Sequence, residues 1–572
     1  MAEYENNRDV AAQTPDDIGF FIHRWEISYV YSCYLNQDVP NLLEAARQLL
    51  QHHFGQIIML PDGAVSWRGV KDVETKQLSE VDTINASTTQ ITFPQGLPLD
   101  LRDPVLMVAA QRSASRNIFS QLAPSSDEFI LISLPELVVY LSDEYSIPLE
   151  VTAQLFQSGI LFLKLRSSMK SENGLHLIDF INHHVNLPLL PIHAIENDRD
   201  LSLLIFDSSF HRRFRLWQRP IVLKVRHRMR RKFLQENEEA IPRESPMPPN
   251  RLRILGHSTS QLSGVVHEYI HALVYALAGR RSGIRYLLLG ERQEPLWNGY
   301  WFESPHVHLL EFSNQSAHAS ENERQHAEAF KWILARTPPR GSHTLRVELP
   351  RNTRVFDDYG VYINEATVLW VYAAHSNYEV SGAGSEADPF SHPTHHHQVT
   401  GDLLEYAPIL YRSLLHELED RNFNWERAFT IRERQVQFEV GLQTTGRFGE
   451  IRDLISEGLQ ARKIDSLKEQ TAALLSLRES IASVSENKRL ATSGMVLATV
   501  FGLLGVPGVV EFLNAYLAPY LPYLSTLPEK SPVRISALTV ATVILLISFT
   551  LLALRFFRRF AKISWPTRIR RS

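Results

Sequence analysis

The stretch GVVHEYIHALVYALAG, residues 264–279, carries the most informative pattern in the 572-residue sequence. It contains His267, Glu268 and His271 in the order His-Glu-x-x-His, and every other position from 264 to 274 is uncharged. A helix turns about 100° per residue, so the two histidines project from one face about 6 Å apart. Two imidazoles placed in this way can share one zinc ion at about 2.1 Å. Glu268 would then reach a metal-bound water as general base, and the uncharged frame predicts a helix buried beneath a cleft.

This segment resembles the active-site helix of the zincin metallopeptidases. The glycine and third histidine that follow in metzincins are missing, because Val274 and Leu277 occupy those positions. The resemblance therefore implies the gluzincin arrangement, in which a glutamate on a later helix, within an Asn-Glu-small sequence, is the third zinc ligand. Asn364-Glu365-Ala366 matches this sequence and opens VYINEATVLWVYAAH, residues 361–375, which we interpret as an apolar helix. Two imidazoles and one carboxylate leave zinc an open position for water.

The spacing of the third ligand departs from many gluzincins. Glu365 follows His271 by 94 residues (365 − 271), whereas Glu323 follows it by 52 (323 − 271) within the polar SENERQHAEAF. That stretch is more typical of a solvated helix face, so we expect Glu365 to bind the metal and keep Glu323 as the alternative. Tyr372 and His375, two to three helical turns beyond Glu365, are candidates for stabilising the oxyanion formed during hydrolysis.

Composition and length predict several units. The chain is 44% hydrophobic and 21% charged, as in globular proteins, and its length predicts two to four units. We expect an α+β fold, in which a zincin-like catalytic domain follows a mixed α/β N-terminal domain and precedes a helical stalk and a transmembrane helical hairpin. The predicted regions are a disordered lead at 1–17, an N-terminal domain at 18–235, a proline-rich linker at 236–250, a metallopeptidase domain at 251–440, a stalk at 441–490, transmembrane helices at 491–510 and 535–554, and a basic tail at 555–572.

Local spacing of apolar residues predicts individual elements within these regions. The expected helices are 41–53, 150–158, 264–278, 319–335 and 364–374, and the expected strands include 129–132, 161–165, 284–289 and 307–312.

Two uncharged runs near the C-terminus suggest a membrane anchor. Ala491–Val510 and Ile535–Leu554 each contain 20 residues, enough to cross a hydrocarbon core of about 30 Å at about 1.5 Å per residue. The tail after Leu554 holds seven Lys or Arg residues and no acidic residue. The positive-inside rule places this tail in the cytoplasm, and a hairpin places the N-terminal part on the same side. The single cysteine, Cys33, and the polar N-terminus without a signal peptide agree with that orientation.

Two further segments are rich in ionisable residues. The basic stretch 211–233 is compatible with lipid headgroups, with nucleic acid or with a solvated edge, and we expect no nucleic-acid partner. His395, His396 and His397 are adjacent and do not share a helix face, so we expect an exposed loop rather than a second metal site.

Together these patterns predict a membrane-anchored zinc peptidase that hydrolyses peptide bonds of a peptide or protein on the cytoplasmic side. The alternative is a non-catalytic membrane scaffold or sensor with a structural or vestigial metal site. Glu268 distinguishes the two, because hydrolysis requires a carboxylate there and a structural site does not. The oligomeric state does not follow from the sequence.

Overall fold

The computed structural model divides the chain into two units, residues 1–471 and 472–572. The residues that it describes are 19–35, 38–70, 72–82, 89–122, 127–209, 219–239, 250–255, 261–277, 297–338, 348–354, 356–374, 393–419, 425–444, 449–481, 483, 494, 505–516, 518–528, 530–544 and 548.

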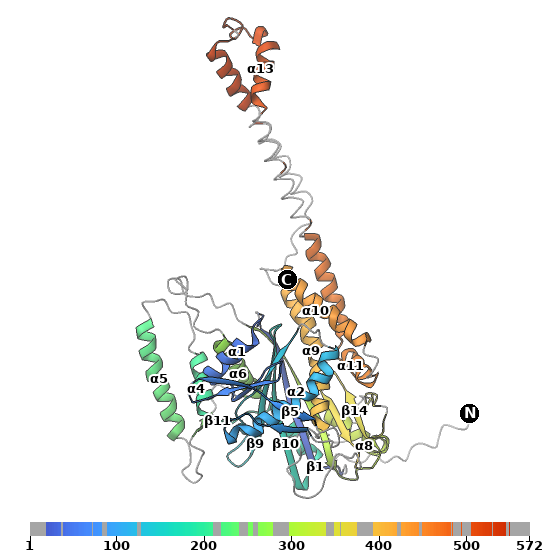
Figure 1. Cartoon of the computed structure of the whole chain (residues 1–572). Coiled ribbons are helices and arrows are strands. Elements are labelled where there is room, and N and C mark those ends of the chain that lie inside the picture. The colour runs from blue at the N-terminus through green and yellow to red at the C-terminus, as the bar shows by residue number, and fades with distance from the viewer. Residues whose placement is uncertain are drawn as a thin grey trace, which may run out of the picture. The chain divides into compact units, whose positions relative to one another are not determined.

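A mixed sheet organises the first unit (Figure 1). Its main path runs β14-β15-β13-β1-β10-β9-β7-β2-β3-β4, while β8 and β12 both pair with β11, and β8 also pairs with β9. All neighbours on the main path are antiparallel except β13 and β15, which are parallel. The strands of this sheet are β1 (Phe21–Leu35), β2 (Ile57–Met59), β3 (Ala64–Arg68), β4 (Val73–Gln77), β7 (Phe129–Ser133), β8 (Leu137–Tyr140), β9 (Ser146–Phe156), β10 (Ile160–His176), β11 (Ala194–Asp198), β12 (Arg251–Leu255), β13 (Trp297–Phe312), β14 (Tyr359–Ile363) and β15 (Val368–Tyr372). A separate hairpin joins β5 (Ser79–Asp82) to β6 (Thr89–Thr92).

Strand β1 is central and pairs with β10 on one side and β13 on the other. It is buried on both faces over most of its length, as a strand between two layers of helices must be. The predicted N-terminal domain, 18–235, contains β1, and the predicted metallopeptidase domain, 251–440, contains β13. Since the two strands are hydrogen-bonded neighbours, these two regions contribute strands to one sheet.

Helices cover both faces of this sheet. Val30 lies opposite Lys164 and Tyr29 opposite Leu165, and adjacent residues of a strand point to opposite faces. The face with Tyr29 and Leu165, which we call the α6 face, packs in the main apolar core with α1, α4, α6 and α8. The face with Lys164, the α9 face, is covered by α2 and α9, and α10 and α11 pack on α9.

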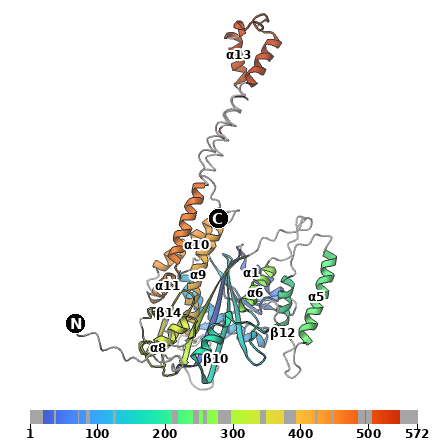
Figure 2. The same cartoon turned by 180° about the vertical axis from the view of Figure 1, so that it is seen from behind.

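The helices differ in length and in the layer they form. Among the described residues, the helices of the first unit are α1 (Leu42–Gln51), η2 (Leu99–Leu101), α2 (Arg102–Leu122), α3 (Leu177–Asp179), η3 (Phe180–Val185), η4 (Leu187–Leu189), α4 (Arg199–Ser209), α5 (Arg219–Glu239), α6 (Leu262–Leu277), α8 (Ala319–Leu334), α9 (Pro393–Glu419), α10 (Trp425–Thr444) and α11 (Gly449–Ala461). A further helix over 464–481 includes residues of both units. Figure 2, from the reverse side, again places α5 and α8 at opposite borders of this unit. The predicted helices 41–53, 264–278 and 319–335 are confirmed by α1, α6 and α8.

Two predicted helices are strands. Residues 150–158 fall mostly in β9, where Ile147, Leu149 and Val151 are buried and the residues between them are exposed, which is a period of two. Residues 364–374 form a turn followed by β15. The Asn364 side chain explains the turn, because its Oδ1 accepts hydrogen bonds from the backbone N–H groups of Ala366 at 2.9 Å and Thr367 at 2.7 Å. Such an Asx turn competes with helix formation.

The histidine-rich segment also differs from its predicted form. Helix α9 begins at Pro393, so residues 395–397 lie in its first two turns, and the His397 side chain is buried. The prediction of an exposed loop is therefore wrong at residues 395–397. Residues 375–392 and the predicted strand 284–289 lie outside the described residues.

The second unit contains α13 (Val506–Tyr516), η6 (Ala518–Tyr520) and a helix over 532–544, which pack around Val510, Ala518 and Leu538. The predicted span 491–510 falls largely outside the described residues, and the predicted span 535–554 falls outside them in part. Within the described part of the chain, no helix combines the length and the apolar character needed to cross a bilayer. The transmembrane hairpin in our fold prediction is therefore wrong. The association with a membrane and the cytoplasmic orientation, which we inferred from the two uncharged runs, stay predictions.

Candidate functional site

The His-Glu-x-x-His segment lies on α6, which packs between α1, α4 and η4 on the α6 face of the sheet. Its buried side is apolar except for Tyr269, whose hydroxyl accepts a hydrogen bond of 2.7 Å from Asn197 Nδ2 on β11. This buried bond fixes the rotation of α6 about its axis. His267 and His271 lie on the opposite, exposed side of the helix, and Glu268 between them is half-buried.

The two histidines face each other. His267 Nε2 and His271 Nε2 are 3.2 Å apart. Partial burial lowers the pKa of both imidazoles below the usual 6.5, and at His271 the neighbouring His267 adds to this effect. Two nitrogens that ligate one tetrahedral zinc at about 2.0–2.1 Å are about 3.3 Å apart, so this pair fits two of the positions around such an ion.

The predicted third ligand does not join this pair. Glu365 lies in the exposed turn between β14 and β15. Its Oε2 forms an ion pair with Lys463 Nζ, which donates to it at 3.1 Å. The alternative, Glu323 on α8, accepts a 3.0 Å hydrogen bond from the Tyr362 hydroxyl. Among the described residues, no three His, Cys, Asp or Glu side chains come close enough to hold a metal ion. The histidine pair therefore fits a metal, whereas the complete gluzincin ligand set does not assemble.

Of the two predicted oxyanion groups, Tyr372 lies away from the histidine pair. Tyr372 is on β15 and points to the α9 face, away from α6, with its hydroxyl 2.6 Å from His397 Nδ1 and 3.2 Å from His308 Nδ1. His397 stacks on Trp370 with ring centroids 4.4 Å apart. Tyr372 is thus part of the packing between β15, β13 and α9. His375 lies outside the described residues.

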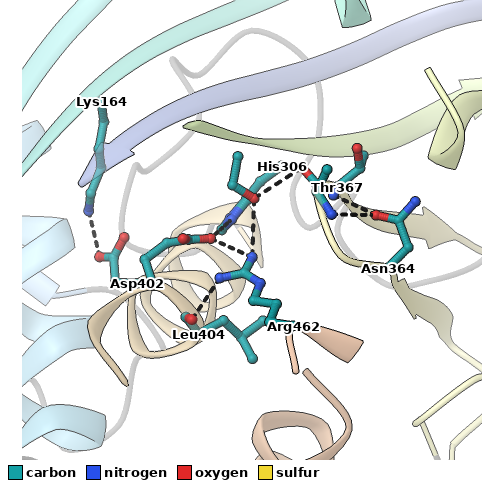
Figure 3. A network of polar contacts seen from close by, with 10 residues as sticks. Lys164, His306, Asn364, Thr367, Asp402, Leu404 and Arg462 are labelled. Carbon is teal, nitrogen blue, oxygen red and sulfur yellow. Dashed lines mark hydrogen bonds and ion pairs between the residues drawn. The ribbon is translucent and has the colours of Figure 1, made fainter. Parts of the chain in front are cut away.

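A second group of chemistry-bearing residues, which we call the buried polar network, lies between the sheet and α9 (Figure 3). Arg462, which follows α11, donates to Glu405 Oε1 at 2.6 Å, to Ser304 Oγ at 3.1 Å and to the Leu404 carbonyl at 2.7 Å. His306 Nε2 is 3.0 Å from the same oxygen of Glu405. These contacts join α9 to β13 and to the chain leaving α11.

An ion pair extends this network to β10. Lys164 Nζ is 2.5 Å from Asp402 Oδ2, and both side chains are buried. Burial raises the pKa of Asp402 despite the nearby lysine. At Glu405 burial acts in the same direction, but Arg462 and His306 outweigh it, so the pKa of Glu405 lies below the usual 4.5. Glu405 is therefore held as a carboxylate by its two partners.

Sequence reasoning missed this network. The available signals were His306 and His308, which flank Val307 on one strand, and Asp402 and Glu405, which are three positions apart on one helix. Alternating residues of a strand share a face, as do residues three apart on a helix. These patterns place each pair of residues on one side of its strand or helix. They do not show that β13 packs against α9, because the contacting residues are about 100 positions apart in the sequence.

Comparisons with known proteins give no further guidance to this site. No protein-family model matches the chain, and neither a curated protein nor a solved structure matches it.

Proposed function

We propose that the chain is a zinc-dependent peptidase whose metal is held by His267 and His271 on α6. The observation that carries the proposal is the 3.2 Å separation of the two Nε2 atoms on an exposed helix face. When bound, zinc lowers the pKa of a water ligand to about 7 and so supplies a nucleophile at neutral pH. Glu268, adjacent to the first ligand in sequence and half-buried, is the group that accepts a proton from that water.

One observation favours a second candidate, a non-catalytic metal-binding protein. Neither Glu365 nor Glu323 approaches the histidine pair among the described residues. A site with two protein ligands would hold zinc less firmly than the three-ligand sites of known catalytic zinc enzymes. Glu268 separates the candidates, since only hydrolysis needs its carboxylate.

Zinc content of the purified full chain, measured by elemental analysis, tests the location of the site. We expect roughly one zinc per chain in the wild type, loss of zinc in His267→Ala and His271→Ala, and unchanged zinc in Glu365→Ala and Glu323→Ala. Loss of zinc in Glu365→Ala would show that Glu365 is a ligand after all, and retention of zinc in both histidine variants would show that the metal is bound elsewhere. No zinc in the well-folded wild type would refute the proposal.

Peptide cleavage then tests the chemistry. We expect Glu268→Gln to keep its zinc and to lose activity against a mixed peptide library by at least about a hundredfold, the usual contribution of a general base. Zinc uptake without cleavage by the wild type would favour the non-catalytic candidate.

A further inference from the structure

Helix α5 lies at the border of the first unit and is attached to it through one face (Figures 1 and 2). Arg226 Nε donates to Asp207 Oδ1 on α4 at 2.9 Å, and Arg230 forms an ion pair of 3.9 Å with the same carboxylate. Phe233, on the same side of the helix, stacks on Phe206 of α4 with ring centroids 4.8 Å apart. These contacts fix which side of α5 faces solvent.

The solvent side of α5 carries two adjacent rows of residues. The first row is basic, with the exposed Lys224, Arg228 and Lys232 at intervals of four residues. The second row is apolar, and in it Val225 is 49% exposed and Met229 is 42% exposed. Positions three apart are neighbours on a helix, so Val225 lies beside Arg228, and Met229 lies beside Lys232 in the same way. We call these five residues the α5 outer face.

The charge of this face has few partners within the protein. No acidic residue occurs from 219 to 235, although the whole chain has a net charge of −4. Among the described residues, Lys224 and Arg228 form no ion pair. Lys232 pairs with Glu236 at 3.2 Å, but both side chains are more than half exposed, and such a pair contributes little. The α5 outer face therefore combines positive charge with exposed apolar side chains.

We propose that the α5 outer face binds the surface of a bilayer that contains anionic lipids. A basic amphipathic helix lies in the plane of such a surface, with its apolar side chains about 5–10 Å deep at the boundary between headgroups and acyl chains. Val225 and Met229 fit this boundary, and the long side chains of the basic row extend from it to the lipid headgroups. Each basic residue beside an anionic leaflet strengthens binding about fivefold. This contact requires neither zinc nor cleavage, so it is independent of the proposed peptidase function.

The exposed apolar row distinguishes a lipid surface from other polyanions. Single-stranded nucleic acid is held by aromatic side chains on which its bases stack, and none of the five residues of the α5 outer face is aromatic. The phosphates of a duplex are bound by cations and hydrogen-bond donors, to which Val225 and Met229 contribute nothing. An acidic peptide likewise engages the cations alone. A lipid surface engages both rows, because hydrocarbon lies directly beneath its charged headgroups.

A local fluorescence measurement on the full chain tests this contact. Cys33 is buried, so a second cysteine can be labelled selectively. The environment-sensitive dye NBD is attached to Val225→Cys and, as a control, to Val70→Cys, an exposed position outside α5. Emission is recorded in EDTA with vesicles of phosphatidylcholine, either alone or mixed with phosphatidylserine. Because the dye reports only its own surroundings, other segments of the chain that reach the vesicle do not produce the signal.

We expect the dye at position 225 to brighten and shift to shorter wavelength with the phosphatidylserine vesicles, and the dye at position 70 to stay unchanged. Lys224→Glu/Arg228→Glu should raise the lipid concentration at half-maximal change at least about twentyfold. Its matched control, Lys170→Glu/Arg351→Glu, changes the charge equally at exposed positions outside α5 and should raise it less than about twofold.

A neutral substitution tests the apolar row by itself. Met229→Gln keeps every charge and should raise the lipid concentration at half-maximal change at least about threefold, because less apolar surface leaves water. Leu99→Gln, at a 75% exposed leucine outside α5, should change it less than about twofold.

Three results would overturn the proposal. One is a dye at position 225 that does not respond to phosphatidylserine vesicles, and another is an equal loss in Lys170→Glu/Arg351→Glu and Lys224→Glu/Arg228→Glu. The third is tighter binding of a labelled oligothymidylate that is lost in Lys224→Glu/Arg228→Glu and kept in Met229→Gln, which would assign the face to nucleic acid instead. Urea midpoints measured in parallel restrict these comparisons to variants that fold like the wild type.

Discussion

Arg462 should be among the most costly single side chains to remove from this protein. It is 5% exposed and donates hydrogen bonds to Glu405, Ser304 and the Leu404 carbonyl. Arg462→Met keeps an unbranched apolar stem but leaves the fully buried Glu405 carboxylate with His306 as its remaining partner. Breaking a buried ion pair by removing one partner costs about 3–5 kcal/mol of unfolding free energy. We expect a loss in this range.

Urea unfolding followed by circular dichroism measures this loss as a shift of the midpoint multiplied by the slope. Arg351→Met, which truncates an exposed arginine, should change the unfolding free energy by less than about 0.5 kcal/mol and serves as the control. The double variant Arg462→Met/Glu405→Gln removes both charges and should recover at least half of the loss. A loss below about 1 kcal/mol in Arg462→Met would refute the argument that this ion pair holds α9 to the sheet.

The same substitution has a definite pH dependence. The pKa of Glu405 in the folded protein lies below the usual 4.5, because Arg462 and His306 outweigh the effect of burial. A carboxylate with a lowered pKa stabilises the folded state above its unfolded pKa, and this contribution is lost as the pH falls through its folded pKa. The difference between wild type and Arg462→Met should therefore be largest near neutral pH and shrink below pH 4.5. A difference that grows on acidification would contradict this assignment.

Two further substitutions test the packing of α9 against the sheet. In Gly401→Ala the new methyl group would lie 2.3 Å from His306 Nδ1, so we expect a loss of more than about 1 kcal/mol in urea unfolding. Gly508→Ala, where no atom lies within 4 Å of the new methyl group, should not destabilise its own helix. In Tyr372→Phe the buried contacts to His308 and His397 are lost, which should cost about 1–3 kcal/mol and leave the zinc content unchanged. Loss of zinc in Tyr372→Phe would show that this side chain belongs to the metal site after all.

The sequence predicted local elements well where a single period dominates. The helix 264–278 has one apolar side and few breaks, and α6 is found at Leu262–Leu277. The prediction of a helix at 364–374 was wrong because an apolar run of this length is compatible with either a helix or a buried strand. Residues 368–372 form a strand because the Asn364 side chain stabilises a turn before β15 in place of a first helical turn.

Assembly of the site was harder to predict, because it depends on which face of the sheet each element covers. A register shift of one residue would move Tyr372 to the α6 face. Its actual neighbour on β13, His308, is placed by strand pairing across 64 residues, and His397 is placed by the packing of α9 on this face. The motif match placed Glu365 beside the histidines by analogy with a helix, and in the turn it instead pairs with Lys463. The helix that carries the His-Glu-x-x-His segment could be predicted from its sequence, whereas the place of Glu365 in a turn beside Lys463 could not.

The central position of β1 has a consequence for synthesis on the ribosome. Ile22 pairs with Phe312, a partner 290 residues further along the chain (312 − 22). At translation speeds of about 5–20 residues per second, roughly 15 to 60 seconds pass between the emergence of these two partners. During this interval one side of β1 exposes a long row of unpaired backbone groups, which is the kind of edge that associates with other chains. Nascent chains that stop before residue 297 should therefore depend on chaperones to stay monomeric.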